Sequence, residues 1–274
     1  MAEDATEDPG IEVRTYFARG RNALVARADF SELYASLYLH QMDTGQRVEG
    51  HLDELLRDAL AALTLHCASR PWNETIAWTV NFQDPLANVF VSGDNKGGTV
   101  VGNIFTDNVK KTGQNLFYAD VVVDQEASRR SVVEFAGNDF FQVLEQYYRE
   151  SEQRPARIFR HDEEDIVLIT AQPDCDLEWL EKLDTDAVKR LDQDTELSLL
   201  ETRHYRFECG CNQDRMLDIL SPVMKSQPDE LFGGDETIRI RCPRCGAKYT
   251  ITRESLEARV AADAPQPETP AKPE

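Results

Sequence analysis

Four cysteines in the last quarter of the chain constrain its fold more than any other feature. Cys209 and Cys211 flank a single residue, Gly210, and thirty residues later Cys242 and Cys245 flank a proline and an arginine. Four thiolates that converge from two short turns suit a tetrahedral zinc ion. The first spacer is shorter than the roughly two to four residues usual in structural zinc sites. The pattern therefore predicts a zinc site with four cysteine ligands. It leaves open whether the zinc is purely structural or guards thiols that can oxidise to each other.

The composition of the 274-residue chain is typical of a folded protein with a real core. Hydrophobic residues make up 41% and charged residues 29%, and no run of eighteen apolar residues is present, so no membrane-spanning segment is expected. The acidic start of the sequence lacks the basic and apolar character of a secretory signal. We therefore expect a cytoplasmic, thiol-reducing location, in which the six cysteines do not form a disulfide framework.

The net charge of −20 argues against nucleic acid as a partner, because affinity for nucleic acid comes mainly from basic side chains that neutralise phosphates. The charge is unevenly spread. Residues 162–201 contain fourteen acids and three bases, whereas residues 203–253 contain nine bases and seven acids. The cysteine-rich region is thus a locally basic module beside a strongly acidic segment.

Hydrophobic periodicity predicts an α+β protein with an N-terminal mixed sheet-and-helix domain, a helical linker and a small C-terminal zinc-binding domain. The N-terminal domain is expected to hold five strands and three helices. The linker is expected to form two weak acidic helices that extend to residue 200 and are stable only when docked. The segments are a disordered tail (1–10), the N-terminal α+β domain (11–173), the acidic linker (174–204), the zinc-binding domain (205–260) and a second disordered tail (261–274).

The chemistry of the thiols favours an oxidant sensor over the alternatives. A thioredoxin-like pair would start a helix, but the residues after Cys245 continue as a strand, which is typical of a zinc ribbon. A hydrolytic zinc enzyme is disfavoured because four thiolates leave no position for water. Five nearby arginines favour thiolate over thiol, and a disulfide between residues two apart closes a small, strained ring that is readily reduced. These arginines are Arg206, Arg215, Arg239, Arg241 and Arg244.

Oxidation to disulfides would expel the zinc and melt the module, which has few large apolar residues and depends on the metal for its fold. The weak acidic linker would then undock and expose apolar surface, while the high charge keeps the chain in solution. The residues thus indicate a protein that binds other proteins' unfolded segments after oxidation.

The cysteine spacing resembles that of the heat-shock protein 33 family of redox-regulated holdase chaperones. Two further segments are similar to the family: the helix and following turn over 144–157, and the sequence from Tyr205 to Cys211 with Arg215 after it. The resemblance covers about residues 12–260. It implies a cytosolic chaperone that needs no ATP and has no enzymatic activity. It also implies a stress response in which the reduced, zinc-bound form is inactive.

In the oxidised state the resemblance implies disulfides between Cys209 and Cys211 and between Cys242 and Cys245. It further implies that this state binds unfolding client proteins and forms a homodimer, with residues 11–173 as the substrate-binding and dimerisation domain and residues 205–260 as the redox switch. The alternative that we retain is a constitutive zinc-ribbon adaptor that binds a protein or RNA partner without redox switching. Cys67 is expected to be a buried apolar residue. Cys175, between Asp174 and Asp176, is expected to have a raised pKa and low reactivity.

Overall fold

The computed structural model describes residues 10–124 and 126–262. The predicted disordered tails lie outside these residues, except for Gly10, Ala261 and Ala262. The chain divides into two compact units, Met1–Cys209 and Gly210–Glu274. None of the helices in the described ranges is long and apolar enough to cross a membrane.

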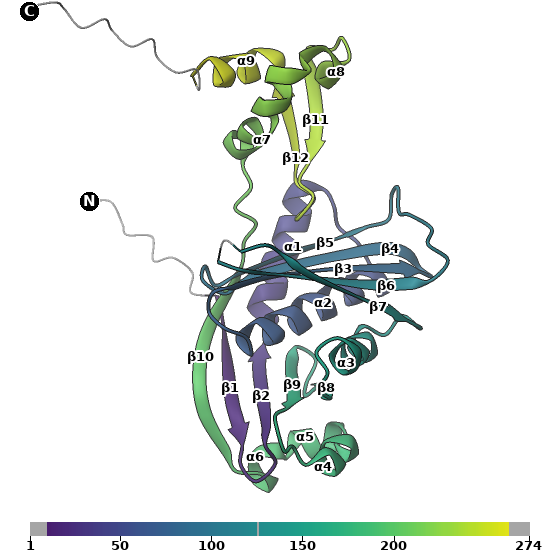
Figure 1. Ribbon diagram of the computed structural model, residues 1–274, viewed down its shortest axis with the longest axis vertical. Helices are drawn as coiled ribbons and strands as arrows, with labels where there is room; N and C mark the ends of the chain where they lie inside the picture. The colour runs from purple at the N-terminus through teal and green to yellow at the C-terminus, as the bar shows by residue number, and fades with distance from the viewer. Residues whose placement is uncertain (1–9, 125, 263–274) are drawn as a thin grey trace, which may run out of the picture. The chain divides into compact units, whose positions relative to one another are not determined.

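The first unit alternates strands and helices, which confirms the predicted α+β class (Figure 1). Its strands join in one ten-stranded sheet of order β7-β6-β3-β4-β5-β10-β1-β2-β9-β8. The elements are β1 (Ile11–Ala18), β2 (Ala23–Asp29), α1 (Ser31–Thr44), α2 (His51–Ala68), β3 (Glu74–Gln83), β4 (Leu86–Asp94), β5 (Thr99–Phe105), β6 (Asn115–Val123), β7 (Arg129–Phe135), α3 (Phe140–Glu150), β8 (Ala156–Arg160), β9 (Asp165–Ala171), α4 (Leu177–Lys182), α5 (Thr185–Lys189), α6 (Leu191–Asp194) and β10 (Leu197–Phe207).

Helix α2 forms the centre of the main core. Every residue from Ala59 to Ala68 is buried, because the helix packs against β3, β4 and β5 on one side and against β1, β2 and β9 on the other (Figure 1). A helix that is apolar on nearly all sides is stable only when protein surrounds it. Helix α3 covers part of the same core with its apolar stripe, which includes Phe140, Leu144 and Tyr147.

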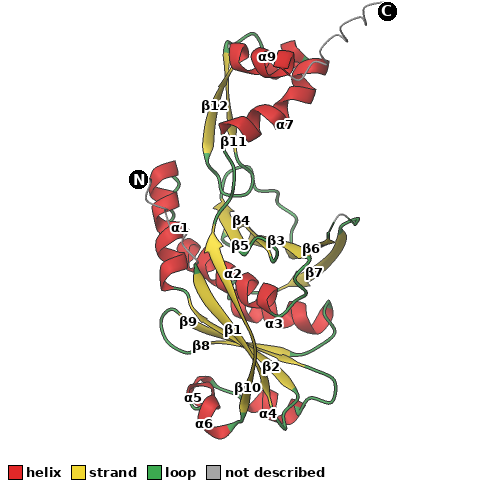
Figure 2. Ribbon diagram, turned by 90° about the vertical axis from the view of Figure 1, so that its left-hand side faces the viewer, coloured by secondary structure: helices red, strands yellow, loops and turns green. Residues whose placement is uncertain are grey.

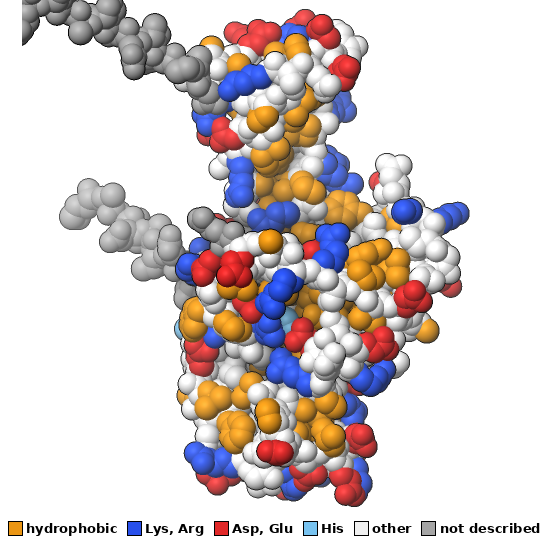
Figure 3. Space-filling view, in the orientation of Figure 1, with side chains coloured by type: hydrophobic (Ala, Val, Ile, Leu, Met, Phe, Trp, Pro, Cys, Tyr) orange, Lys and Arg blue, Asp and Glu red, His pale blue; other side chains and the backbone are white. Residues whose placement is uncertain are grey.

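The three short acidic helices pack on a separate apolar patch of the sheet. Leu180, Leu183, Val188 and Leu191 are each at most 6% exposed. They form one cluster with side chains from β1, β2, β8 and β9: Ala18, Ala23, Val25, Phe159, Val167, Ile169 and Ala171. Figure 3 shows carboxylates and basic side chains around apolar ones at this end of the first unit. The acidic segment is therefore docked on the sheet, which is the condition under which the sequence predicts its helices to be stable.

Strand β10 connects the acidic helices to the first cysteine pair and is anchored at the end of α2. The Arg203 side chain is 6% exposed. It donates to the carbonyl oxygens of Cys67 (3.2 Å) and Arg70 (2.8 Å) and pairs with Glu201 at 2.7 Å. Its guanidinium also lies over the Trp72 ring, 4.2 Å from the centroid. A cation at a helix C-terminus satisfies carbonyls that have no partner within the helix, so this contact fixes β10 to the core.

Two predictions about local structure are wrong. The prediction of five strands in the N-terminal domain is too low, because β1 through β9 all lie within residues 11–173. The second acidic helix is expected to extend to Leu200, but the last helix ends at Asp194 and Leu197 begins β10. The cause is tertiary, since β10 pairs along its length with β1, which is far away in sequence. Such pairing overrides a weak local preference for helix.

The second unit is a β-hairpin with helices packed on one side of it (Figure 2). Its apolar cluster is small and centres on Met216, Leu217, Phe232, Ile251 and Leu256. The elements are α7 (Gln213–Ser226), α8 (Pro228–Phe232), β11 (Thr237–Arg241), β12 (Lys248–Thr252) and α9 (Arg253–Ala262). Strands β11 and β12 are antiparallel and flank the turn that holds the second cysteine pair, as the sequence predicts for a zinc ribbon.

Candidate metal centre

The first cysteine pair lies in the turn between β10 and α7. Gly210, between the two cysteines, has a φ of +64°. This left-handed conformation favours glycine and turns the chain sharply enough for both sulfurs to face the same point. Arg215, in the first turn of α7, donates through Nη1 to the Gly210 carbonyl oxygen at 3.5 Å. Asn212 caps α7 by accepting from the Arg215 backbone N–H at 2.8 Å, so the helix start fixes the turn.

The second pair lies in the tight turn of the β11–β12 hairpin. The Cys242 N–H donates to the Ala247 carbonyl oxygen at 2.8 Å, and the Gly246 N–H donates to the Cys242 carbonyl oxygen at 2.9 Å. Gly246 has a φ of +78°. Both Cys242 and Cys245 are 2% exposed, whereas Cys209 and Cys211 are half-buried. An oxidant in solution therefore has better access to the first pair.

The four sulfurs of Cys209, Cys211, Cys242 and Cys245 all lie within 4.8 Å of one another. The Cys211 and Cys245 Sγ atoms are 3.4 Å apart. Ligands at about 2.3 Å around a tetrahedral zinc ion stand roughly 3.8 Å from each other, so the cluster has the size and the donor set for a metal such as zinc. None of these four cysteines forms a disulfide. Within the described ranges this is the one group of three or more metal-binding side chains that could share an ion.

Tyr249 contacts the site and was missed by the sequence reasoning. Its hydroxyl donates to the Cys211 Sγ at 3.0 Å. Burial, together with the bond to Cys211, raises the pKa of the Tyr249 phenol above its ordinary value. The signal was present in the sequence as an aromatic residue on the strand that follows Cys245. Its partner, thirty-eight residues earlier, could not be read from spacing.

The nearby arginines are not equivalent. Arg215 lies against the first cysteine turn. Arg206 instead pairs with Glu208 at 2.6 Å and donates to the Gly97 carbonyl oxygen at 3.3 Å. Its charge is thus matched by a carboxylate within the first unit, and it contributes less to thiolate formation than its position in sequence suggested.

The two remaining cysteines lie outside the cluster. Cys67 is fully buried in α2, and burial raises the pKa of its thiol, which confirms the expected apolar role. Cys175 is half-buried, and burial raises the pKa of its thiol as well. A protonated thiol is a weak nucleophile, so neither residue is expected to react early with an oxidant.

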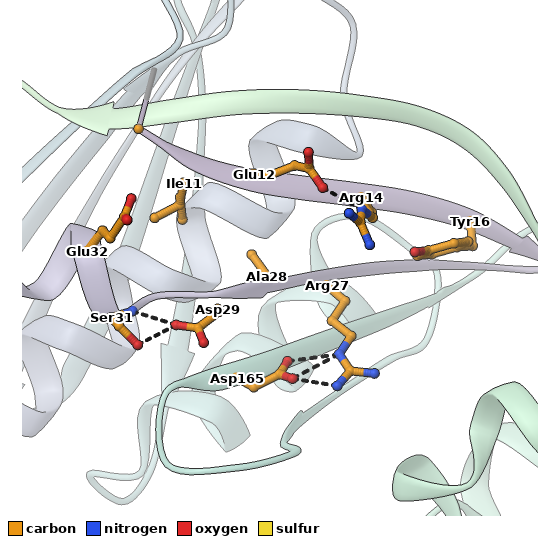
Figure 4. A pocket seen from close by; sticks show the side chains of 11 residues that line it. Ile11, Glu12, Arg14, Tyr16, Arg27, Ala28, Asp29, Ser31, Glu32 and Asp165 are labelled. Carbon is orange, nitrogen blue, oxygen red and sulfur yellow. Dashed lines mark hydrogen bonds and ion pairs between the residues drawn. The ribbon is translucent and has the colours of Figure 1, made fainter. Parts of the chain in front are cut away.

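A hollow of the first unit lies elsewhere, on the sheet face formed by β1, β2 and β9 (Figure 4). Its volume is about 730 Å3, and four of its charged side chains are paired with each other: Arg27 pairs with Asp165, and Arg14 pairs with Glu12. A second hollow of about 310 Å3 shares Tyr16 and Arg27 and lies beside Val188 and Leu191 of the acidic helices. The acidic helices therefore do not completely fill the space between themselves and the sheet.

Comparison with known proteins agrees with this architecture. The family model described as Hsp33 protein matches residues 162–252. A 33 kDa chaperonin of Vibrio vulnificus is 24% identical over 251 residues, which cover 80% of this chain and 86% of the relative. A 33 kDa chaperonin of Edwardsiella ictaluri is 24% identical over 236 residues, covering 74% and 80% of the two chains.

The fold is shared with a solved relative. The crystal structure of the 33 kDa chaperonin (Hsp33 homologue) from Thermotoga maritima superposes with a TM-score of 0.69 at 13% identity, covering 92% of this chain and 98% of the other. The clustered cysteines are consistent with three findings. These are the matched family model, the relatives that extend along most of the chain, and the shared fold. The chain thus resembles the heat-shock protein 33 family, in sequence over residues 162–252 of the family model and along most of the 33 kDa chaperonins, and in its fold.

Proposed function

We propose that this protein is a redox-regulated holdase chaperone that acts without ATP in the cytoplasm. The observation that carries the proposal is the pairing of a four-thiol cluster with a short acidic segment docked on apolar sheet. Helices α4, α5 and α6 have six, five and four residues. Isolated helices of fewer than about 12 residues are unstable in water, so these helices persist only while they are held against the sheet.

In the reduced state the four cysteines would hold one zinc ion as thiolates. Zinc, when bound, supplies the charge that keeps four thiolates together and stabilises the fold of the second unit. The protein's own contribution is geometric: Gly210 and Gly246 shape the two turns, and the hairpin fixes the second pair. The small apolar cluster of this unit would not maintain the fold without the metal.

Activation would be an oxidation by a peroxide. A thiolate sulfur attacks one oxygen of hydrogen peroxide, the O–O bond breaks, and hydroxide leaves and takes a proton to become water. The resulting sulfenic acid is attacked by the neighbouring thiolate, and its hydroxyl leaves and is protonated to a second water. Each pair thus loses two electrons to one peroxide. The proposed pairs are Cys209 with Cys211 and Cys242 with Cys245, and disulfide sulfurs no longer serve as zinc ligands.

Loss of the metal would melt the second unit and weaken the attachment of the segment that precedes it. Release of α4–α6 would uncover the apolar patch around Val25, Val167 and Ile169 and free the apolar side chains of the helices themselves. An exposed apolar surface on a chain of net charge −20 can hold unfolding proteins while remaining in solution. The same surface would support a homodimer in the oxidised state.

The decisive experiment treats the zinc-loaded protein with peroxide at mildly raised temperature. Zinc release and suppression of client aggregation are measured together, and both should rise in parallel. The variant Cys242→Ser/Cys245→Ser should lose oxidant control, whereas Cys175→Ser, which removes a thiol outside the cluster, should retain it. Zinc release with no protection of the client would refute the holdase function.

One observation favours a second candidate, a constitutive zinc-ribbon adaptor. Residues 237–252 contain four bases and no acid in a chain that has 50 acids and 30 bases. Binding to RNA or to an acidic protein that is sensitive to salt and insensitive to peroxide would support the adaptor. The net charge of the chain opposes RNA, so we rank this candidate second.

A further inference from the structure

Tyr249 lies where it can influence the reactivity of the thiol cluster. It belongs to β12, where it pairs with Ile240 of β11. Its half-buried ring packs with the apolar cluster of the second unit, which leaves little freedom for the side chain. The hydroxyl at its end donates to the Cys211 Sγ at 3.0 Å. The hairpin that carries the second cysteine pair therefore also supplies a hydrogen bond to the first pair.

The sulfur that accepts this bond has a special position in the cluster. Cys211 is half-buried, in contrast to the buried Cys242 and Cys245, and it belongs to the pair that solvent can reach. Its Sγ also lies 3.4 Å from the Cys245 Sγ, so it joins the two cysteine turns. A change in the charge or orientation of this one sulfur affects both.

A hydroxyl that donates to a thiolate draws electron density away from the sulfur. Attack on a peroxide uses the same lone pair, so the bonded thiolate is the weaker nucleophile. Donors of this kind beside metal ligands also orient them, and their removal lowers metal affinity by about 10- to 100-fold. Both effects delay the loss of the metal, because the thiolate reacts more slowly with peroxide and the oriented ligand holds the metal more tightly.

We propose that Tyr249 is a positioning residue that sets how readily the cluster is oxidised, by holding the Cys211 sulfur through its hydroxyl. The inference rests on the proposed function and adds a regulator to its site. Tyr249 takes no electron and transfers no proton in this role. Its bond to sulfur must break before Cys211 can turn toward Cys209, and this raises the amount of oxidant that the protein withstands.

The test compares Tyr249→Phe, which removes only the hydroxyl, with Thr250→Val as a matched control. Thr250 is the next residue of the same strand and its side chain is exposed. Its substitution by valine likewise removes one hydroxyl. Each full-length protein is loaded with zinc, and its metal content is measured. The rate of zinc release is then followed at a fixed excess of hydrogen peroxide.

We expect the Phe variant to bind one zinc ion and to release it about ten times faster than the wild type, with the Val variant unchanged. In cobalt-substituted protein the sulfur-to-metal charge-transfer band should move to lower energy in the Phe variant alone, since its sulfur is richer in electrons. A Phe variant with the wild-type rate and the wild-type band overturns the inference.

A second variant keeps the test decisive if Tyr249→Phe folds poorly. Fluorotyrosine at position 249 has nearly the same size and a stronger hydroxyl donor, so zinc release should be slower than in the wild type. An unchanged or faster release contradicts the inference. Failure of the proposed function looks different: the wild type would release zinc under peroxide and leave client aggregation unaffected, whatever residue stands at position 249.

Discussion

Replacement of Leu180 by alanine should activate the protein without any oxidant. Leu180 is 1% exposed in α4 and belongs to the cluster that attaches the acidic helices to the sheet. A buried Leu→Ala substitution costs about 3 kcal/mol, within a range of roughly 2–5 kcal/mol. Since the contact exists only while the helices are docked, the loss falls on docking. Because about 1.4 kcal/mol corresponds to a factor of ten, the population with released helices should rise roughly 100-fold.

The assay measures suppression of client aggregation by the reduced, zinc-loaded variant, with amide hydrogen exchange in α4–α6 as the structural readout. Leu177→Ala is the matched control, because Leu177 lies in the same helix but is 46% exposed. The reasoning is refuted if Leu180→Ala loses exchange protection in α4–α6, keeps its zinc, and still fails to protect the client. It is also refuted if the two variants behave alike.

Three further substitutions test individual contacts. Arg203→Met should destabilise the first unit by about 3 kcal/mol in urea unfolding, because it leaves the Cys67 and Arg70 carbonyls without their donor. Its control is Arg206→Met, at the more exposed pair with Glu208, which should cost less than about 1 kcal/mol. Equal losses in the two variants would argue that Arg203 does not anchor β10 to the end of α2. Burial raises the pKa of Asp58 from 3.8 to about 6, so folding favours its protonated form, and its contribution to stability should fall as the pH rises from about 4 through 6. Asp58→Asn should therefore gain on the wild type over this window in urea titrations, and a difference that is independent of pH would count against the shift. Gly210→Ala should weaken zinc retention against a chelator by roughly five- to tenfold. The added Cβ meets only the Arg215 guanidinium at 3.7 Å, so the cost is the strain of a left-handed backbone, about 1 kcal/mol. Gly233→Ala, at a φ of +58° away from the thiols, is the control and should leave zinc retention unchanged.

The parts of the fold that the sequence predicts well are those encoded by neighbouring residues. Helix α2 is indicated by closely spaced leucines and alanines, and the β11–β12 hairpin by alternating isoleucines beside the second cysteine pair. The thiol cluster follows from spacing alone, because two short turns with paired cysteines have few other uses. The sequence also predicts that the acidic helices are stable only when docked, since they are short and highly charged, but it leaves open whether they are docked at rest.

The parts that the sequence does not predict depend on distant partners. Strand β10 looks like the end of an acidic helix until β1 is available to pair with it. Arg203 reads as a surface charge near the cysteines, yet it is buried against the C-terminus of α2 by contacts more than 130 residues away. The bond from Tyr249 to Cys211 needs the hairpin folded back on the first cysteine turn. Each of these contacts is specified by the three-dimensional arrangement rather than by a local pattern.

Hydrogen exchange across residues 176–195, measured before and after peroxide treatment of the zinc-loaded protein, tests the central claim most directly. The account predicts that zinc release is accompanied by loss of protection throughout α4, α5 and α6. Helix α2, which is enclosed by the sheet, should remain protected. Oxidised protein that has lost its zinc but keeps full protection in the acidic helices would contradict the claim that the thiol cluster controls their docking.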